Sequence, residues 1–256
     1  LVATDKMVDS PTNNFCTLNP LIKPHGTVAY QEGNLRADPT VAWDAIAGTI
    51  GVSSGKWYWE QVTVDQLYST VGIVGDNASA WFSSSLNPQN GTGFILYAYD
   101  GNKYIDTVTT SYGATFTSDD IIGVALNMDD SEVTFYKNNA TQGAISFSGT
   151  IVNANMVMPA ANLVGLAPDT NEYYFNAGQD SSFAGNFTAQ GNADENGIGD
   201  FYYEPPSGYL ALCTSNLPDP EIALPADNFN TVLWTGDASA TRSITGLGFQ
   251  ADMMWS

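Results

Sequence analysis

The chain has 256 residues, of which only 13% are charged, yet its formal net charge is −20 because 27 acidic side chains accompany seven basic ones. The basic residues are scattered, so no basic patch exists that could neutralise phosphates. The composition therefore argues against nucleic-acid binding and against adsorption to an anionic membrane. A chain of this length can bury a substantial core as one large β domain, or as one domain with part of a second.

Read in order, the sequence predicts short strands separated by turn residues, with no sustained helical periodicity. Residues 1–24 form an extended N-terminal segment rich in Pro and Asn. The strands expected after it lie at residues 27–30, within 35–44, and at 56–64, 71–74, 93–99, 103–105, 121–128, 132–137, 144–147, 156–161 and 172–176. Strands at such short intervals are typical of an antiparallel β-sandwich.

A hairpin between Ser118 and Asn138 is the best-defined local structure in the sequence. Residues 121–128 form a nearly continuous apolar run, as in a strand that is buried on both faces. Residues 129–131, Asp-Asp-Ser, are turn formers. Residues 132–137 alternate between polar and apolar, as a half-buried strand does. We expect the rest of the fold to be arranged around this hairpin.

Four stretches in the same order resemble the SPRY family, whose members are bent β-sandwiches related in shape to concanavalin-like lectins. They are the aromatic strand GKWYWEQVTV at 55–64, VGIVG at 71–75, the hairpin itself, and YFNAGQ at 174–179. The resemblance covers roughly residues 13–179. It implies an all-β, SPRY-like or jelly-roll antiparallel sandwich at residues 25–180.

The sequence changes character after this region. Residues 181–220 are rich in Gly, Asn, Asp and Pro but carry several aromatic side chains whose apolar area is too large to leave in water. We therefore expect an ordered extension that packs on the sandwich, followed at residues 221–256 by the start of a second β-rich module. This part, Ser181 to Ser256, is similar to segments of large structural proteins of marine tailed phages.

The chain ends and the cysteines add two expectations. The sequence shows neither a signal peptide nor a transmembrane run, and it is expected to begin, and to end, inside a longer polypeptide. Cys16 and Cys213 flank the SPRY-like region. Two buried free thiols are favoured, and a disulfide between them is the alternative.

The residues give little support for catalysis. The motif Glu-x-Asp-x-x-Glu, typical of concanavalin-like glycosidases, does not occur, and the nearest carboxylate pair, Glu60 and Asp65, falls on opposite faces of a regular strand. The single histidine, His25, provides no histidine cluster for zinc. We expect a protein that is not an enzyme.

One stretch resembles a calcium-binding loop. In residues 194–200, DENGIGD, oxygen-bearing side chains alternate around a glycine, as hard cations prefer. Pro205 stands where an EF-hand would supply its bidentate glutamate. Calcium at Asp194, Asn196 and Asp200 is thus the main candidate cofactor site, and Asp100, Asn102 and Asp106 form a weaker second one. The alternative is that these residues are ordinary turn formers in an acidic chain.

Exposed aromatic side chains are the usual anchors for sugars and peptides. The candidates near the loops that form the partner-binding edge in the SPRY family are Trp81, Tyr97, Tyr99, Tyr104 and Tyr112. The alternative is that they pack in the core.

The expected function is that of a non-enzymatic phage structural protein in a tail fibre, an appendage or a capsid decoration. It would act in particle assembly or host-surface recognition, in the virion or otherwise outside the cell. Its partners would be other virion proteins or copies of itself in a homo-oligomer, with no membrane insertion. A lectin-like module that binds a host-surface glycan is the alternative.

Overall fold

The computed structural model describes residues 13–22, 28–39, 42–64, 68–78, 91–147, 151, 154–164 and 172–218, together with isolated positions after residue 231. Regular structure in these ranges is β-strand, apart from the short 3-10 turn η2 (Glu32–Asn34). No helix in the described part is long and apolar enough to cross a membrane. The chain forms two compact units, Leu1–Asn216 and Leu217–Ser256, and the strands below belong to the first.

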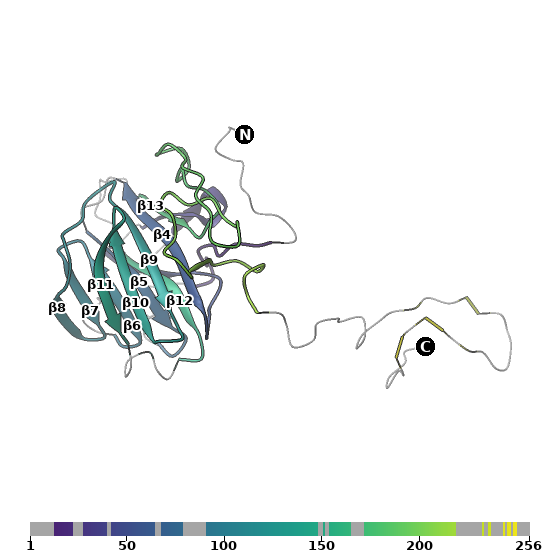
Figure 1. The fold of residues 1–256 in the computed structure, drawn as a ribbon. Helices are drawn as coiled ribbons and strands as arrows, with labels where there is room; N and C mark the ends of the chain where they lie inside the picture. Colours follow the sequence, from purple (N-terminus) through teal and green to yellow (C-terminus); the bar gives the residue numbers. More distant parts are fainter. Residues whose placement is uncertain are drawn as a thin grey trace. The chain divides into compact units, whose positions relative to one another are not determined.

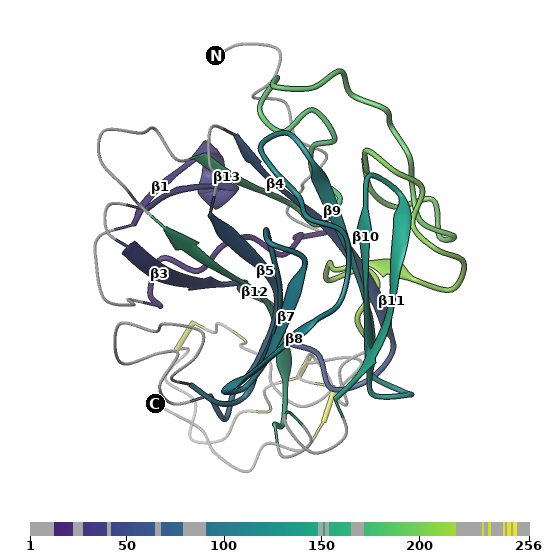
Figure 2. The ribbon, with the colours of Figure 1, turned by 90° about the vertical axis from the view of Figure 1, so that its left-hand side faces the viewer.

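The first unit is a sandwich of two sheets, which Figures 1 and 2 show from two sides. The large sheet contains, in spatial order, β1 (Ala29–Gln31), β2 (Arg36–Asp38), β13 (Glu172–Asn176), β4 (Lys56–Val64), β9 (Ile121–Asn127), β10 (Glu132–Lys137) and β11 (Ala140–Ser146), and the short β14 (Leu210–Ala211) pairs with β4 in parallel. The small sheet contains β3 (Ala42–Ala47), β12 (Val157–Val164), β5 (Ser69–Gly75), β6 (Phe94–Ala98), β7 (Asn102–Ile105) and β8 (Val108–Ser111). All other pairings are antiparallel.

Side-chain alternation along β4 divides its residues between two environments. Tyr58 packs edge-on against Phe201 of the C-terminal segment, with ring centroids 5.2 Å apart. Tyr58 and Glu60 therefore point to the outer face of the large sheet. Trp59 lies on the opposite face and is fully buried, so it belongs to the core between the sheets.

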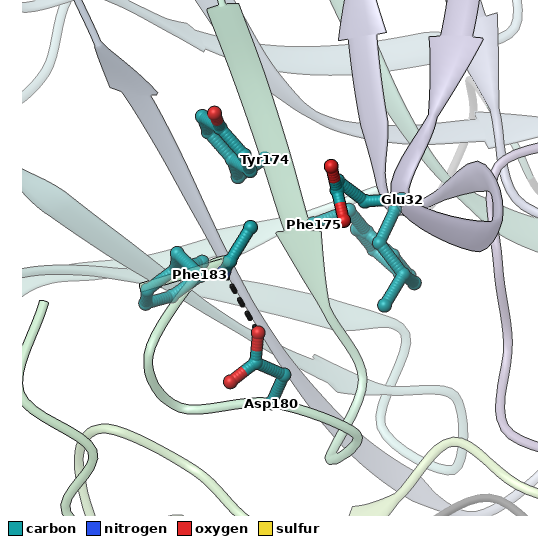
Figure 3. A pocket seen from close by; sticks show the side chains of 7 residues that line it. Glu32, Tyr174, Phe175, Asp180 and Phe183 are labelled. Atoms are coloured by element: carbon teal, nitrogen blue, oxygen red, sulfur yellow. Dashed lines mark hydrogen bonds between the residues drawn. The ribbon is translucent and has the colours of Figure 1, made fainter. Parts of the chain in front are cut away.

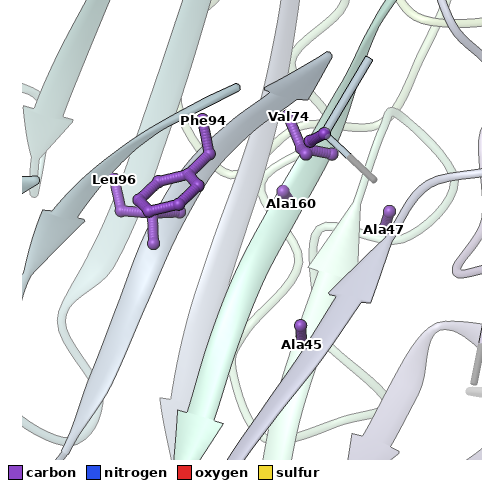
Figure 4. Close-up of a cluster of buried hydrophobic side chains, with 7 residues drawn as sticks. Ala45, Ala47, Val74, Phe94, Leu96 and Ala160 are labelled. Atoms are coloured by element: carbon purple, nitrogen blue, oxygen red, sulfur yellow. The ribbon is translucent and has the colours of Figure 1, made fainter. Parts of the chain in front are cut away.

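The central strands β5 and β6 of the small sheet are buried on both faces. Tyr97 of β6 contacts Phe135 of β10, with ring centroids 5.6 Å apart, so Tyr97 faces the large sheet. Its neighbour Leu96 faces away and belongs to a buried cluster on the outer face, drawn in Figure 4, that consists of Ala45, Ala47, Val74, Ala78, Phe94, Leu96 and Ala160. Burial on both faces explains why β6 reads as the continuous apolar run FILYA.

The segment 181–216 covers the outer face of the large sheet. Phe201 and Ala211 pack with Tyr58 in one buried cluster, and Phe183 packs with Val62 and Tyr174 in another. Apolar burial of these rings stabilises the attachment. Cys16 and Cys213 are both buried and free, as the sequence favoured.

The antiparallel β-sandwich expected from the sequence is confirmed. The strands β4, β10 and β13 begin and end at the predicted residues. The sequence missed β8, whose four residues are all exposed, because a strand without an apolar face shows no alternation. It also started β11 at residue 144, whereas the strand begins at Ala140. Most of the expected second module, 221–256, lies outside the described residues.

Candidate functional site

Tyr68 and Tyr99 meet where β5 begins and β6 ends, and Tyr104 of β7, opposite Leu96, is near Tyr99; we call these three residues the outer tyrosine group. The rings of Tyr68 and Tyr99 meet edge to face, with centroids 5.0 Å apart and an interplanar angle of 87°. The backbone N–H of Tyr99 donates to the carbonyl of Ser69 at 3.1 Å, which joins the two strand ends. Tyr68 is 41% exposed. The group therefore presents aromatic surface to solvent at one end of a rigid scaffold.

Asp100 gives this group an acidic neighbour. Burial, and after it the charge of Asp100, raises the pKa of Tyr99 and of Tyr104. The Asp100 carboxylate accepts hydrogen bonds from the backbone N–H and the side-chain amide of Asn102, at 3.0 and 2.8 Å. This local turn, in which Gly101 has a φ of 83°, connects β6 to β7. Ring edges beside oxygen acceptors suit a polar peptide or a sugar.

A second set of aromatic residues joins the two sheets, and we call Tyr97, Tyr112, Phe116 and Phe135 the inner aromatic group. The ring centroid of Tyr97 lies 5.4 Å from that of Tyr112 and 5.0 Å from that of Phe116. The Tyr97 hydroxyl donates to the carbonyl of Ala114, and burial raises the pKa of Tyr112 to about 12. Tyr97 is fully buried, so this group supports the sandwich.

The five predicted ligand-binding residues thus fall into different environments. Tyr99 and Tyr104 belong to the outer tyrosine group, Tyr97 and Tyr112 belong to the inner aromatic group, and Trp81 lies outside the described residues. Sequence reasoning missed Tyr68. The pairing of β5 with β6 brings it beside Tyr99. No pattern in the sequence around Tyr68 predicts that contact.

The loop at 194–200 is organised by protein donors. One oxygen of Asp194 accepts the N–H groups of Asn196 and Ile198, both at 2.9 Å, and the other accepts the N–H of Ala211 at 2.9 Å and the amide of Asn216 at 2.8 Å. The described residues contain no cluster of three His, Cys, Asp or Glu side chains that could hold a metal. Calcium at Asp194, Asn196 and Asp200 stays a prediction, and the loop has a structural explanation without it.

Glu60 is a buried carboxylate on the outer face of β4, under the segment 181–216. It accepts hydrogen bonds from the Tyr58 hydroxyl and the Asn176 amide, both at 3.2 Å, and from the backbone N–H groups of Tyr202 and Tyr203, at 2.8 and 2.7 Å. Burial raises its pKa to about 7 although these hydrogen bonds oppose the shift. Asp65, which the sequence analysis considered with Glu60 as the nearest carboxylate pair, lies outside the described residues. Glu60 thus serves to attach the extension.

A small hollow lies between η2, β13 and the turn that follows β13 (Figure 3). Its volume of about 10 Å³ holds no more than one water molecule. The carboxylate of Asp180, which lines it, accepts the backbone N–H of Ala184 at 2.7 Å. The hollow therefore has no room for an organic ligand.

Comparison with known proteins finds a family similar to part of the sandwich. Residues 56–180 match the model of the SPRY domain family. A probable ATP-dependent RNA helicase, ddx1, from Dictyostelium discoideum is 32% identical over 108 residues, which cover 40% of this chain and 12% of the helicase. The E3 ubiquitin-protein ligase TRIM58 from Mus musculus is 26% identical over 120 residues, which cover 46% of this chain and 24% of the ligase. The chain thus spans only a minor part of the length of these relatives.

Solved structures were compared as well. The SPRY domain of human HERC1 matches with a TM-score of 0.47 and 17% identity, over 62% of this chain and 93% of that one. The PSpry domain of TRIM65 matches with a TM-score of 0.48 and 11% identity, over 63% of this chain and 89% of that one.

Proposed function

We propose that the sandwich, of which residues 56–180 match the SPRY domain family model, is a non-catalytic protein-interaction module whose contact surface is the outer tyrosine group. The observation that carries this proposal is the Tyr68–Tyr99 pair, an exposed aromatic contact held at the strand ends of a rigid sandwich. Tyrosine is enriched at the energetic centres of interfaces. Strand ends and loops on a rigid scaffold are where binding residues concentrate.

The setting we propose is a virion or another extracellular assembly, with the chain as part of a phage tail fibre, appendage or capsid decoration. The strongly acidic surface and the similarity of Ser181 to Ser256 to phage structural proteins support this setting. The relatives named above are a helicase and a ubiquitin ligase, and their names do not bear on this setting. The partners would be other virion proteins or further copies of the chain.

Electron cryo-microscopy of the native assembly tests this proposal. We expect density for the sandwich with Tyr68 and Tyr99 in contact with another protein. Tyr99→Ala should weaken binding of the chain to particles that lack it by about tenfold or more. Leu21→Ala is the control, because Leu21 is 83% exposed but lies outside the outer tyrosine group. Unchanged binding of Tyr99→Ala would reject the proposed contact surface.

A glycan-binding module is the second candidate, favoured by the position of Asp100 and Asn102 beside the Tyr68–Tyr99 pair. Aromatic rings with nearby polar groups can stack on a sugar and bind its hydroxyls. A glycan array probed in calcium and again in EDTA distinguishes this candidate. Binding lost in Tyr99→Ala would support it, and silence in both conditions would reject it.

A further inference from the structure

The sandwich has four edge strands, and three of them are protected against further pairing. Beside β3, the N-terminal segment forms a bridge from Leu18 to Gly48, and the N–H of Asn19 donates to the carbonyl of Ala47 at 2.9 Å. β1 has only three residues and leads directly into the acidic Glu32. Natural proteins use such short, charged or covered edges to prevent association.

The edge strand β11 is protected by its geometry. Its pairing with β10 is interrupted by a register shift, and Gly143 at that point has a φ of 98°. The hydroxyl of Tyr112 donates to the carbonyl of Gly143, and the side chain of Gln142 accepts the N–H of Ala114 at 2.8 Å. A bulge twists an edge away from a regular partner. β11 is therefore a poor template for an added strand.

Within the described residues, the edge strand β8 shows none of these devices. It pairs with β7 in four regular steps, and its sequence, Val-Thr-Thr-Ser, contains no charge, proline or glycine. No charged residue occurs between Asp106 and Asp119, in a chain whose net charge is −20. All four side chains are exposed, and Val108 keeps 58% of its surface in contact with solvent. Figure 2 looks onto the side of the sandwich where β8 lies.

The hydrogen-bond alternation shows which groups β8 offers. The N–H of Tyr112 donates to the carbonyl of Gly101 at 2.9 Å, so the N–H of Tyr112 points toward the β7 side of the hairpin. Bonded and non-bonded pairs alternate in an antiparallel ladder. The pairs of β7 with Thr109 and Ser111 are therefore non-bonded, and the N–H and C=O groups of these two residues point away from β7.

We propose that β8 pairs with β8 of a second copy of this chain, in an antiparallel ladder whose two-fold axis passes through Thr110. Thr109 then exchanges both hydrogen bonds with Ser111 of the copy, and the exposed Val108 lies opposite Tyr112 of the copy. Such an interface is isologous and self-complementary. Pairs of threonine with threonine or serine and of an aromatic with a β-branched residue are favourable across strands.

The charge of the chain favours a copy as the occupant. Two chains of net charge −20 repel each other, and β8 adds no acidic side chain to the contact, while the neighbouring charge, Lys103 opposite Thr110 on β7, is basic. A basic partner would instead be drawn to an acidic surface. A four-residue ladder buries less surface than a stable dimer requires. The pairing thus rests on the proposed role in an assembly, where tethering raises the local concentration.

Disulfide trapping tests this pairing. Across a non-bonded antiparallel pair the Cα atoms are about 4.5 Å apart, which is within the range that a disulfide requires. Thr110→Cys in the full chain should therefore form a covalent dimer under mild oxidation. The matched control is Thr141→Cys, which is exposed on the protected edge strand β11. The native Cys16 and Cys213 are buried and do not interfere.

We expect Thr110→Cys to cross-link on the order of tenfold faster than Thr141→Cys, because only the former meets its own copy at disulfide distance. High salt should speed the reaction by screening the repulsion between copies. Adding Val108→Lys should slow it without changing the melting temperature, since Val108 is exposed. Equal rates for the two cysteine variants would reject the pairing. If Tyr99-dependent binding survives in that case, the proposed function stands and only the β8 contact is wrong.

Discussion

The carboxylate of Glu60 on β4 accepts the backbone N–H of Tyr203, 143 positions later in the chain, at 2.7 Å. The adjacent N–H of Tyr202 donates to the other oxygen of the same carboxylate, at 2.8 Å. One buried side chain thus satisfies two consecutive donors of a segment with little regular structure of its own. Removing the charge of the Glu60 carboxylate from water costs free energy, and the four hydrogen bonds that this carboxylate accepts offset that cost.

The raised pKa of Glu60 makes stability depend on pH. Its pKa is about 7 in the folded chain, against 4.5 ordinarily, chiefly because of burial. Between these values the folded chain holds a proton that the unfolded chain has released, so the free energy of unfolding falls as pH rises through this window. The full change is roughly 3 kcal/mol. Denaturant unfolding at pH 5 to 8 should show this slope, and Glu60→Gln should flatten it. Parallel slopes for the two proteins would contradict the assignment.

Gly123 on β9 is required by the ring beside it. A Cβ at this position would lie 2.6 Å from the Tyr58 hydroxyl oxygen and 3.0 Å from a ring carbon. Tyr58 cannot easily move, because Phe201 packs on its ring and its hydroxyl donates a hydrogen bond to Glu60. Gly123→Ala should therefore cost about 1–3 kcal/mol of unfolding free energy, measured by denaturant titration. In a Tyr58→Ala background the same change should cost much less. An additive result would show that the two positions do not interact.

Both cysteines should resist thiol reagents in the folded chain. Burial raises the pKa of Cys16 to about 11 and also raises the pKa of Cys213. At pH 8 almost no thiolate of Cys16 is present, and the thiolate is the reactive form. In an Ellman assay, no thiol of the folded chain should react rapidly in buffer, whereas both thiols should react once guanidinium chloride unfolds the chain. Rapid labelling of the folded chain would contradict the burial of these residues.

The sequence predicts those parts of this fold whose signal is local. β4 could be read because Trp57, Trp59 and the residues between them form an aromatic, β-rich run. Tyr68 and the role of Glu60 could not be read in the same way. Each depends on a contact between segments far apart in the chain, which no local pattern encodes.

The candidate site shows the same limit. Tyr97 and Tyr99 are two residues apart on one short stretch, and both are aromatic, so the sequence predicts ligand binding equally for both. Tyr97 faces the large sheet and is buried, whereas Tyr99 follows the end of β6 and meets Tyr68. Where a strand ends decides between core and surface, and strand ends are the least certain part of a sequence-based prediction.

Asp194 allows a structural role to be separated from calcium binding. Its two oxygens accept four hydrogen bonds, three of them from backbone N–H groups. Asp194→Asn replaces one acceptor with a donor, so at least one buried N–H loses its partner, at a cost of about 1–3 kcal/mol. Thermal unfolding in EDTA should show this loss in full, and added calcium should leave it unchanged. Glu195→Gln is the control, because it removes the same charge from an exposed neighbour while its amide oxygen can still accept from Ser207 and Gly208, so stability should hardly change. If the effect of Asp194→Asn appears only when calcium is present, the loop is a metal site and the structural explanation fails.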